Sequence, residues 1–310
     1  AGQDITTIQF ATSNPVLNLG TSNENRFYNL TIEYNGTSSV TAIDASDDNV
    51  DVIFQNCKIK STRSCFNAVT TNMKVLNCEI VSTSTIQSQI IVYLYGLISH
   101  CTLTATTFTG GLIYEISSGN GTGGVLQYCK LNAKSTNNSG SFAIGHALAG
   151  VIANCTVEAQ NNALGNTSTA MRIENTYFST EGGVSGDNST CVQSLEGGLI
   201  THCFFHQKTD TNFGVVSQLA ENPTAIYDSA FYAPDTSANV IGNVGVDDSL
   251  WVNCQMMNDG TGGFSITTST VGRRIKIANV TSNRPLDLKF TLLPADKGLE
   301  SVTLGIAKAY

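Results

Sequence analysis

A short phrase built around a cysteine recurs along this chain of 310 residues. It reads FQNCKI at 54–59, VLNCEI at 75–80, ISHCTL at 98–103 and IANCTV at 152–157. If the cysteine is position zero, the series is Leu30, Cys57, Cys78, Cys101, Cys129, Cys155, Thr176, Cys203, Ser229, Cys254 and Val280. The mean spacing is 25 residues, and single intervals run from 21 to 28. A repeat of this length predicts a solenoid, in which each repeat forms one coil and stacks on its neighbours.

Apolar residues stand three positions before and two positions after position zero. In the coil of Cys57 they are Phe54 and Ile59. Positions zero and plus two share one face of a strand, whereas minus three would lie on the other face of a straight strand. Because all three positions are apolar, we expect the chain to bend between minus three and zero.

The residue directly before position zero is expected to form this bend. The eleven residues are Asn29, Asn56, Asn77, His100, Tyr128, Asn154, Asn175, His202, Asp228, Asn253 and Asn279. Asn, Asp and His tolerate the left-handed backbone conformation that a sharp corner needs. We therefore predict a one-residue corner in each coil, with a ladder of Asn side chains that point into the interior. In this reading His100 and His202 are structural corner residues.

The order of strand, Asn corner, strand and variable loop resembles the right-handed parallel β-helix. This is the solenoid of pectate lyases, polygalacturonases, pectin methylesterases and phage tailspikes. The resemblance implies an all-β fold of about eleven coils over residues 21–282, with 1–20 as an N-terminal cap. Residues 283–310 depart from the repeat and would form a C-terminal cap or an oligomerisation segment. The fold serves both enzymes and inert stalks, so it implies no particular activity.

The composition narrows the classes of partner. Charged residues make up 13% of the chain, the net charge is −8 and the isoelectric point is near 4.9. An acidic chain is poorly suited to bind nucleic acid. The longest apolar run, residues 89–99, is about half the ~20 residues that a transmembrane helix needs. We expect neither a nucleic-acid partner nor membrane insertion.

The nine cysteines raise the question of disulfides or a metal site. Seven of them fall at position zero, and no C-x-x-C pair occurs. Because Thr, Ser and Val occupy the same column, we expect small packed thiols selected by size, with some disulfides as the alternative. Cys65 and Cys191 lie off the ladder and are expected to be more exposed.

Some charged residues and one histidine resemble parts of enzyme motifs. Asp47 and Asp48, His146 and Arg274 are similar to the motifs of polygalacturonases, but they belong to coils far apart. Asp51 lies in a phrase similar to one in pectin methylesterases, without the elements that complete that site. Asp44, Asp47, Asp48 and Asp51 could together hold a calcium ion through oxygen ligands. The alternative is a polar loop that feeds the next strand, and we expect no other cofactor.

An aromatic stripe on the outer face is the strongest binding candidate. Tyr177 and Phe204 occupy the same outward column in successive coils, and Tyr227 lies on the next coil at the other outward column. Exposed aromatic residues in a row are typical of contacts with sugar or protein. A loop folded over the stripe is the alternative. His146 and His206 lie off the ladder, and the sequence assigns them no role.

These features favour a noncatalytic structural or adhesive protein of a virion or cell exterior. It would present a rigid β-helix to polysaccharide or to protein subunits, and the resemblance to tailspikes implies a homo-oligomer. The alternative is a polysaccharide hydrolase or lyase, whose carboxylates could converge from different coils. The candidates are the acidic residues near the stripe, namely Glu158, Glu174, Glu181, Asp187 and Glu196.

Overall fold

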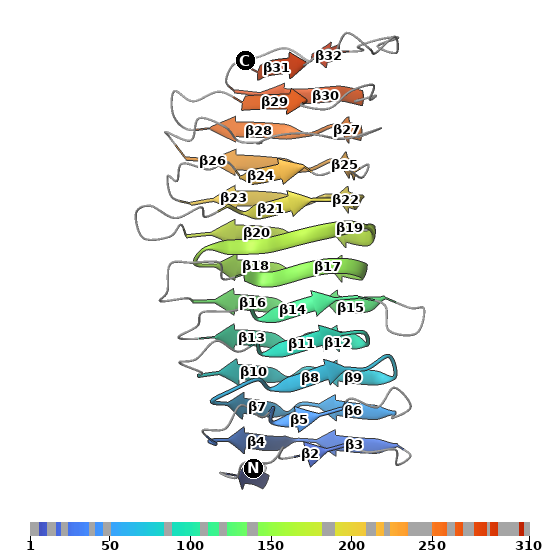
Figure 1. Cartoon of the computed structure of the whole chain (residues 1–310), viewed down its shortest axis with the longest axis vertical. Coiled ribbons are helices and arrows are strands. Elements are labelled where there is room, and N and C mark those ends of the chain that lie inside the picture. Colours follow the sequence, from blue (N-terminus) through green and yellow to red (C-terminus); the bar gives the residue numbers. More distant parts are fainter. Residues whose placement is uncertain are drawn as a thin grey trace, which may run out of the picture. The chain divides into compact units, whose positions relative to one another are not determined.

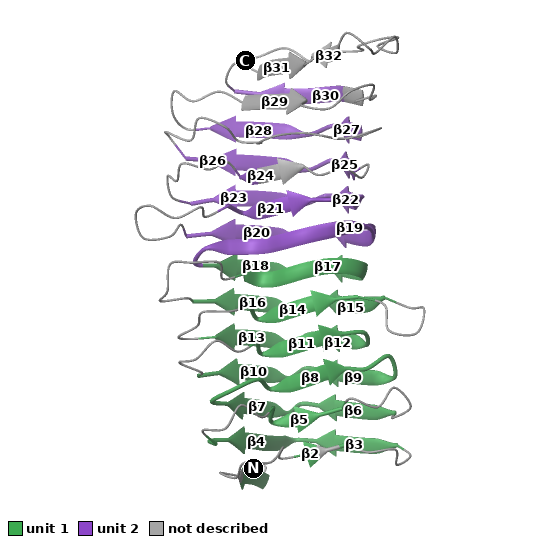
Figure 2. Ribbon diagram, in the orientation of Figure 1, with its two compact units in different colours: residues 1–159 green, residues 160–310 purple. Residues whose placement is uncertain are grey.

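The computed structural model describes residues 6–10, 17–19, 24–36, 41–45, 51–83, 89–105, 111–117, 123–134, 142–181, 190–208, 215–219, 224–234, 250–258, 264–268, 276–283, 286–290 and 304–306. Within these ranges every regular element is a β-strand, and none is a helix. Accordingly, the described residues include no helix of the length and apolarity that a membrane span requires. The chain divides into two compact units, Ala1–Ala159 and Gln160–Tyr310 (Figure 2).

Three ladders of parallel strands build the first unit (Figure 1). The first ladder contains β1 (Thr6–Phe10), β4 (Leu30–Tyr34), β7 (Lys58–Ser61), β10 (Glu79–Ser82), β13 (Thr102–Ala105), β16 (Lys130–Ala133) and β18 (Thr156–Ala159). The second contains β3 (Asn25–Tyr28), β6 (Val52–Gln55), β9 (Met73–Leu76), β12 (Leu97–Ser99), β15 (Gly124–Gln127) and the end of β17 (Phe142–Ala153). The third contains β2 (Leu17–Asn18), β5 (Ile43–Asp44), β8 (Phe66–Val69), β11 (Ile91–Leu94), β14 (Ile113–Ile116) and the start of β17.

The second unit repeats this arrangement. Its first ladder contains β20 (Tyr177–Thr180), β23 (Phe204–Gln207), β26 (Ala230–Ala233), β28 (Gln255–Asn258) and the end of β30 (Lys276–Ser282). The second contains the end of β19 (Asn162–Glu174), β22 (Gly198–Thr201), β25 (Thr224–Tyr227), β27 (Leu250–Val252), β30 and β32 (Leu304–Ile306). The third contains the start of β19, β21 (Val192–Leu195) and β24 (Val216–Leu219), and β29 (Phe264–Thr268) pairs with β31 (Leu286–Phe290).

The expected fold class, an all-β parallel solenoid, is confirmed. The number of turns differs from the eleven expected for the whole chain. In the described residues the first ladder has seven strands in the first unit and five in the second, which makes twelve. The cap boundaries at residues 20 and 283 remain predictions.

The expected bend before position zero is confirmed, because all eleven corner residues have φ between 45° and 56°. The direction of their side chains was wrong: every one of the eleven is exposed. The reason is geometric. Since minus three and zero both face the core, as Phe54 and Cys57 do, the residue between them lies on the convex side of the bend, where its side chain meets water.

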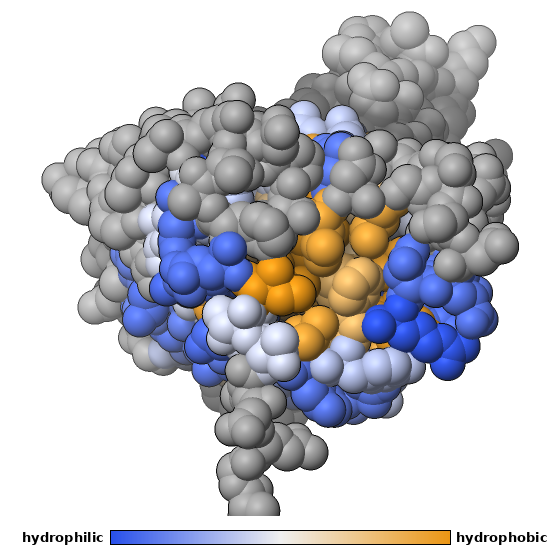
Figure 3. Space-filling model, turned by 90° about the horizontal axis from the view of Figure 1, so that it is seen from below, coloured by the Kyte–Doolittle hydropathy of each residue, from blue (hydrophilic) through white to orange (hydrophobic). Residues whose placement is uncertain are grey.

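Apolar side chains fill the interior of each coil. Ile59, Ile80 and Leu103 are fully buried at position plus two of three successive coils. Seen from below, apolar residues gather in the middle of the face and hydrophilic residues lie towards its rim (Figure 3). The core therefore runs along the axis of the first unit and is surrounded by the three ladders.

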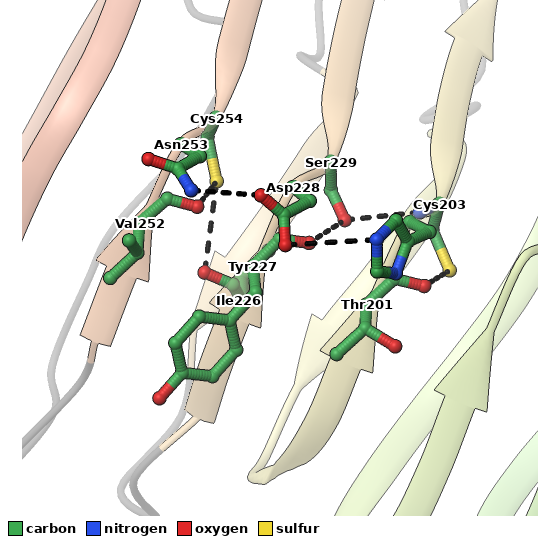
Figure 4. Close-up of polar contacts among 10 residues, drawn as sticks. Thr201, Cys203, Ile226, Tyr227, Asp228, Ser229, Val252, Asn253 and Cys254 are labelled. Carbon is green, nitrogen blue, oxygen red and sulfur yellow. Dashed lines mark hydrogen bonds and ion pairs between the residues drawn. The ribbon is translucent and has the colours of Figure 1, made fainter.

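The column at position zero is held by hydrogen bonds as well as by packing. The Cys101 thiol donates to the Ser99 carbonyl (Sγ···O 3.2 Å). In the second unit, the hydroxyl of Ser229 donates to the Tyr227 carbonyl (Oγ···O 2.8 Å) (Figure 4). The same atoms accept N–H groups from the preceding coil: Cys203 N–H donates to Ser229 Oγ at 3.1 Å (Figure 4). Nine of the eleven side chains at position zero donate to the carbonyl two residues earlier, whereas Leu30 and Val280 cannot.

All nine cysteines lie in the described residues and all are free thiols. Cys65 and Cys191 are fully buried, so the expectation that they are more exposed was wrong. Cys65 directly precedes β8 and Cys191 directly precedes β21, and both strands belong to the third ladder. Burial raises the pKa of Cys203 to about 12 and that of Cys254 to about 11. These two thiols therefore stay protonated at neutral pH and act as packing groups and hydrogen-bond donors.

Candidate functional site

An outward-facing group of aromatic side chains lies on the first ladder of the second unit. Tyr177 on β20 and Phe204 on β23 are direct neighbours in the ladder. Their ring centroids are 5.6 Å apart. The next residues along the two strands, Phe178 and Phe205, are fully buried and stack in the core. Strand alternation therefore turns Tyr177 and Phe204 outwards, as the sequence predicted.

Two further residues extend this group. The Tyr177 hydroxyl lies 2.7 Å from Nδ1 of His206, and the rings of Phe204 and His206 are 5.7 Å apart. Tyr232 on β26, which pairs with His206, meets the imidazole edge to face at 4.7 Å. We call Tyr177, Phe204, His206 and Tyr232 the aromatic cluster. All four side chains are half-buried.

The sequence contained a signal for the two residues that were missed. His206 and Tyr232 both stand three positions after position zero, in successive coils. This column lies on the same outward face as position plus one, because side chains two apart share a face. Scanning every odd offset from position zero would have placed all four residues on one surface.

Tyr227 does not belong to the aromatic cluster. It ends β25 in the second ladder and pairs through its backbone with Thr201 and Val252. The corner at Asp228 separates it from β26 (Figure 4). The structure therefore brings together two of the three stripe residues expected from the sequence.

The candidate catalytic carboxylates that the structure describes are mostly paired with basic side chains. Glu174 forms an ion pair with Arg172, Glu181 with Lys208 (2.5 Å) and, in the first unit, Glu158 with Lys130 (3.5 Å). Glu196 is half-buried, and its backbone N–H donates to Thr167 Oγ1 at 3.1 Å. Asp187 lies outside the described residues. Three of the five candidates are thus held as surface ion pairs rather than as carboxylates that face one another.

The acidic residues considered for calcium are only partly described. Asp44 Oδ1 accepts a hydrogen bond from Asn67 Nδ2 at 3.4 Å, and Asp51 is exposed. Asp47 and Asp48 lie outside the described residues, as does Arg274. Among the residues that are described, no group of three His, Cys, Asp or Glu side chains is placed to hold a metal ion.

His100 and His202 adopt the corner conformation that the sequence predicted, but their side chains are exposed. His202 Nε2 lies 3.7 Å from Asp228 Oδ2. Asn253 Nδ2 donates to Asp228 Oδ1 at 2.9 Å (Figure 4). The His100 ring stacks on Tyr128 at 4.8 Å. Both belong to exposed ladders of side chains along a corner.

The aromatic cluster offers two kinds of contact on one surface. Ring faces suit the apolar face of a pyranose, and the Tyr and His polar atoms suit its hydroxyl groups. The backbone of each residue is fixed in the ladder, so little order has to be gained on binding. Comparison of the chain with protein-family models, with curated proteins and with solved structures finds no match.

Proposed function

We propose that this chain is a noncatalytic structural or adhesive protein that binds glycan through the aromatic cluster. The observation that carries this proposal is the set of four contacting aromatic side chains on the outer face of the second unit. Aromatic pairs contribute about 0.5–1.5 kcal/mol beyond burial, which favours a surface that is ordered before it meets a ligand. The pairing of Glu158, Glu174 and Glu181 with Lys or Arg also favours binding over hydrolysis.

Polysaccharide binding with and without the cluster tests this proposal. We would measure retention of the protein on a panel of immobilised polysaccharides, for the native chain and for Phe204→Ala. Tyr28→Ala, which removes a 43% exposed tyrosine in the first unit, is the control. We expect at least a tenfold loss of affinity for Phe204→Ala and no loss for the control. Equal retention of all three proteins would contradict a role for the cluster.

One observation favours the alternative, a polysaccharide-degrading enzyme. The hydrogen bond between Tyr177 and His206 couples two groups that can exchange a proton with a substrate. Release of reducing sugar or unsaturated uronide from the same panel, with and without calcium, would reveal such an activity. Release that disappears in His206→Gln would establish the enzyme and overturn the noncatalytic proposal. Binding without release would support the adhesive function.

We propose the exterior of a cell or virion as the place of this function. A homo-oligomer would present several copies of the aromatic cluster and so raise the avidity for a repetitive glycan. Other protein subunits are the further proposed partners. The burial of all nine free thiols is compatible with an oxidising exterior, because buried thiols react slowly. Light scattering of the purified chain measures the oligomeric state directly.

A further inference from the structure

A second group of polar and aromatic side chains lies on the third ladder of the first unit. Tyr93 on β11, Glu115 on β14 and His146 on β17 are aligned in register on three successive coils. Tyr95 and Tyr114 flank this row. We call these five residues the tyrosine patch.

The rings of the tyrosine patch contact one another across the coils. Tyr114 meets Tyr93 edge to face at 6.3 Å and meets His146 edge to face at 5.3 Å. Tyr93 and Tyr95 are parallel at 5.7 Å. Tyr114 is 38% exposed and the other four are half-buried. The patch therefore combines several ring surfaces with one carboxylate and one imidazole.

Two strands of this ladder, β11 and β14, expose more side chains than an alternating strand does. In β14, Ile113 and Ile116 are fully buried, and both residues between them, Tyr114 and Glu115, face outwards. The strand β11 shows the same pattern, with its two middle residues half-buried. In β14 this places Tyr114 and Glu115, which are adjacent in sequence, on one surface, which a regular strand would not allow.

The charge of this ladder restricts the ligand. None of the strands β8, β11, β14 and β17 contains Lys or Arg, and Glu115 is their only carboxylate. The first ladder of the same unit carries Lys58, Lys60 and Lys130. A uronate or phosphate group would find no cation on these four strands and would be repelled by Glu115. Sugar hydroxyls, in contrast, can donate to Glu115 and exchange hydrogen bonds with tyrosine and histidine.

We propose that the tyrosine patch is a second glycan-binding site, selective for chains of uncharged pyranose units. The assignment rests on the proposed function in taking glycan as the ligand of this chain. It uses different residues in a different unit, so the two proposed sites can be tested separately. Tyr114 supplies the main stacking surface, and Glu115 accepts hydrogen bonds from ring hydroxyls.

Calorimetric titration of the full chain with cellohexaose, mannohexaose, maltohexaose and hexagalacturonate tests the proposal. We expect at least one neutral hexasaccharide to bind, and hexagalacturonate to bind at least tenfold more weakly at this site. Tyr114→Ala and Glu115→Gln should each weaken binding of the neutral sugar about tenfold or more. Glu115→Gln preserves size and shape, so it keeps the test valid if Tyr114→Ala disturbs folding.

Tyr28→Ala, on β3 and outside both groups of residues, is the control and should leave this binding unchanged. Neutral binding that Phe204→Ala abolishes and both patch variants retain would overturn the inference while supporting the proposed function. Absence of binding to all three neutral hexasaccharides would overturn the inference alone. The proposed function would then be tested separately, by the panel of immobilised polysaccharides.

Discussion

The two units build the same kind of coil from different interior side chains. In the first unit, position zero is Cys in five successive coils, and position plus two is Ile, Leu or Val. In the second unit, position zero reads Thr176, Cys203, Ser229, Cys254 and Val280. Position plus two becomes a stack of Phe178, Phe205 and Phe231, with ring distances of 5.3 and 5.0 Å.

This difference shows which property each column requires. Thr176 Oγ1 donates to the Glu174 carbonyl at 2.7 Å, in the same way that the Cys101 thiol donates to Ser99 at 3.2 Å. The donor atom changes from sulfur to oxygen, but in both cases it donates to the carbonyl two residues earlier. Position plus two requires only apolar volume, since aliphatic and aromatic side chains both serve. Where position zero is polar, its side chain therefore serves as a hydrogen-bond donor, although Leu30 and Val280 show that an apolar side chain can also stand there. Position plus two is selected by packing.

The largest effect should come from the aromatic stack of the second unit. Phe205 is fully buried between two parallel rings. We expect Phe205→Ala to lower the free energy of unfolding by about 3–5 kcal/mol, because it opens a cavity and removes both ring contacts. Denaturant unfolding measures this change. Phe204→Ala, one residue away on the outward face, should lower the free energy of unfolding by about 1 kcal/mol or less. Equal losses in the two variants would contradict the inward direction of Phe205 and the outward direction of Phe204.

Removal of a hydrogen-bond donor at position zero should lower the stability by an intermediate amount. Ser229→Ala leaves the Tyr227 carbonyl and the Cys203 N–H without their side-chain partner. We expect a loss of about 1–3 kcal/mol in the free energy of unfolding. Ser229→Cys restores the donor found in the first unit and should recover most of that loss. If Ala and Cys are equivalent at this position, size rather than hydrogen bonding selects the column.

The buried thiols predict a fall in stability at alkaline pH. The pKa of Cys254 is raised from 9.0 to about 11 by burial. Its stabilising contribution is fully present below pH 9, the unfolded value, and is lost as the pH rises towards 11. At pH 10 we expect a loss of about 1 kcal/mol from this thiol. Between pH 7 and 11 the denaturation midpoint should fall less steeply in Cys254→Ser than in the native chain. An equally steep fall in both proteins would contradict a contribution from this thiol.

The smallest effect is expected at the exposed corner. The His202–Asp228 pair is separated by 3.7 Å, with side chains 62% and 40% exposed. Exposed ion pairs contribute about 0–1 kcal/mol, and Asn tolerates the same backbone conformation. We expect His202→Asn to change the unfolding free energy by less than about 0.5 kcal/mol. A loss several times larger would mean that the corner ladder carries more of the stability than its exposure suggests.

The structure of the coil could be predicted from the sequence, but much of the candidate site could not. The corner residues, the buried columns and the outward direction of Tyr177 and Phe204 follow from local alternation around position zero. The joining of His206 and Tyr232 to that pair depends on ladder register two residues further along. The alignment of Tyr93, Glu115 and His146 depends on the register of the third ladder. That ladder lies after loops of variable length, so counting from position zero does not predict it.

The sequence by itself determined the solenoid, because a bend and two apolar columns in each repeat allow no simpler way to bury the core. The tertiary structure decided where the side chains around that core point. It turned the corner residues outwards, directed the thiols and hydroxyls to the carbonyls beside the corner, and grouped aromatic residues from separate coils. The physical reason is that alternation is a local property of one strand, whereas hydrogen bonds and ring contacts between coils depend on the register in which the coils stack.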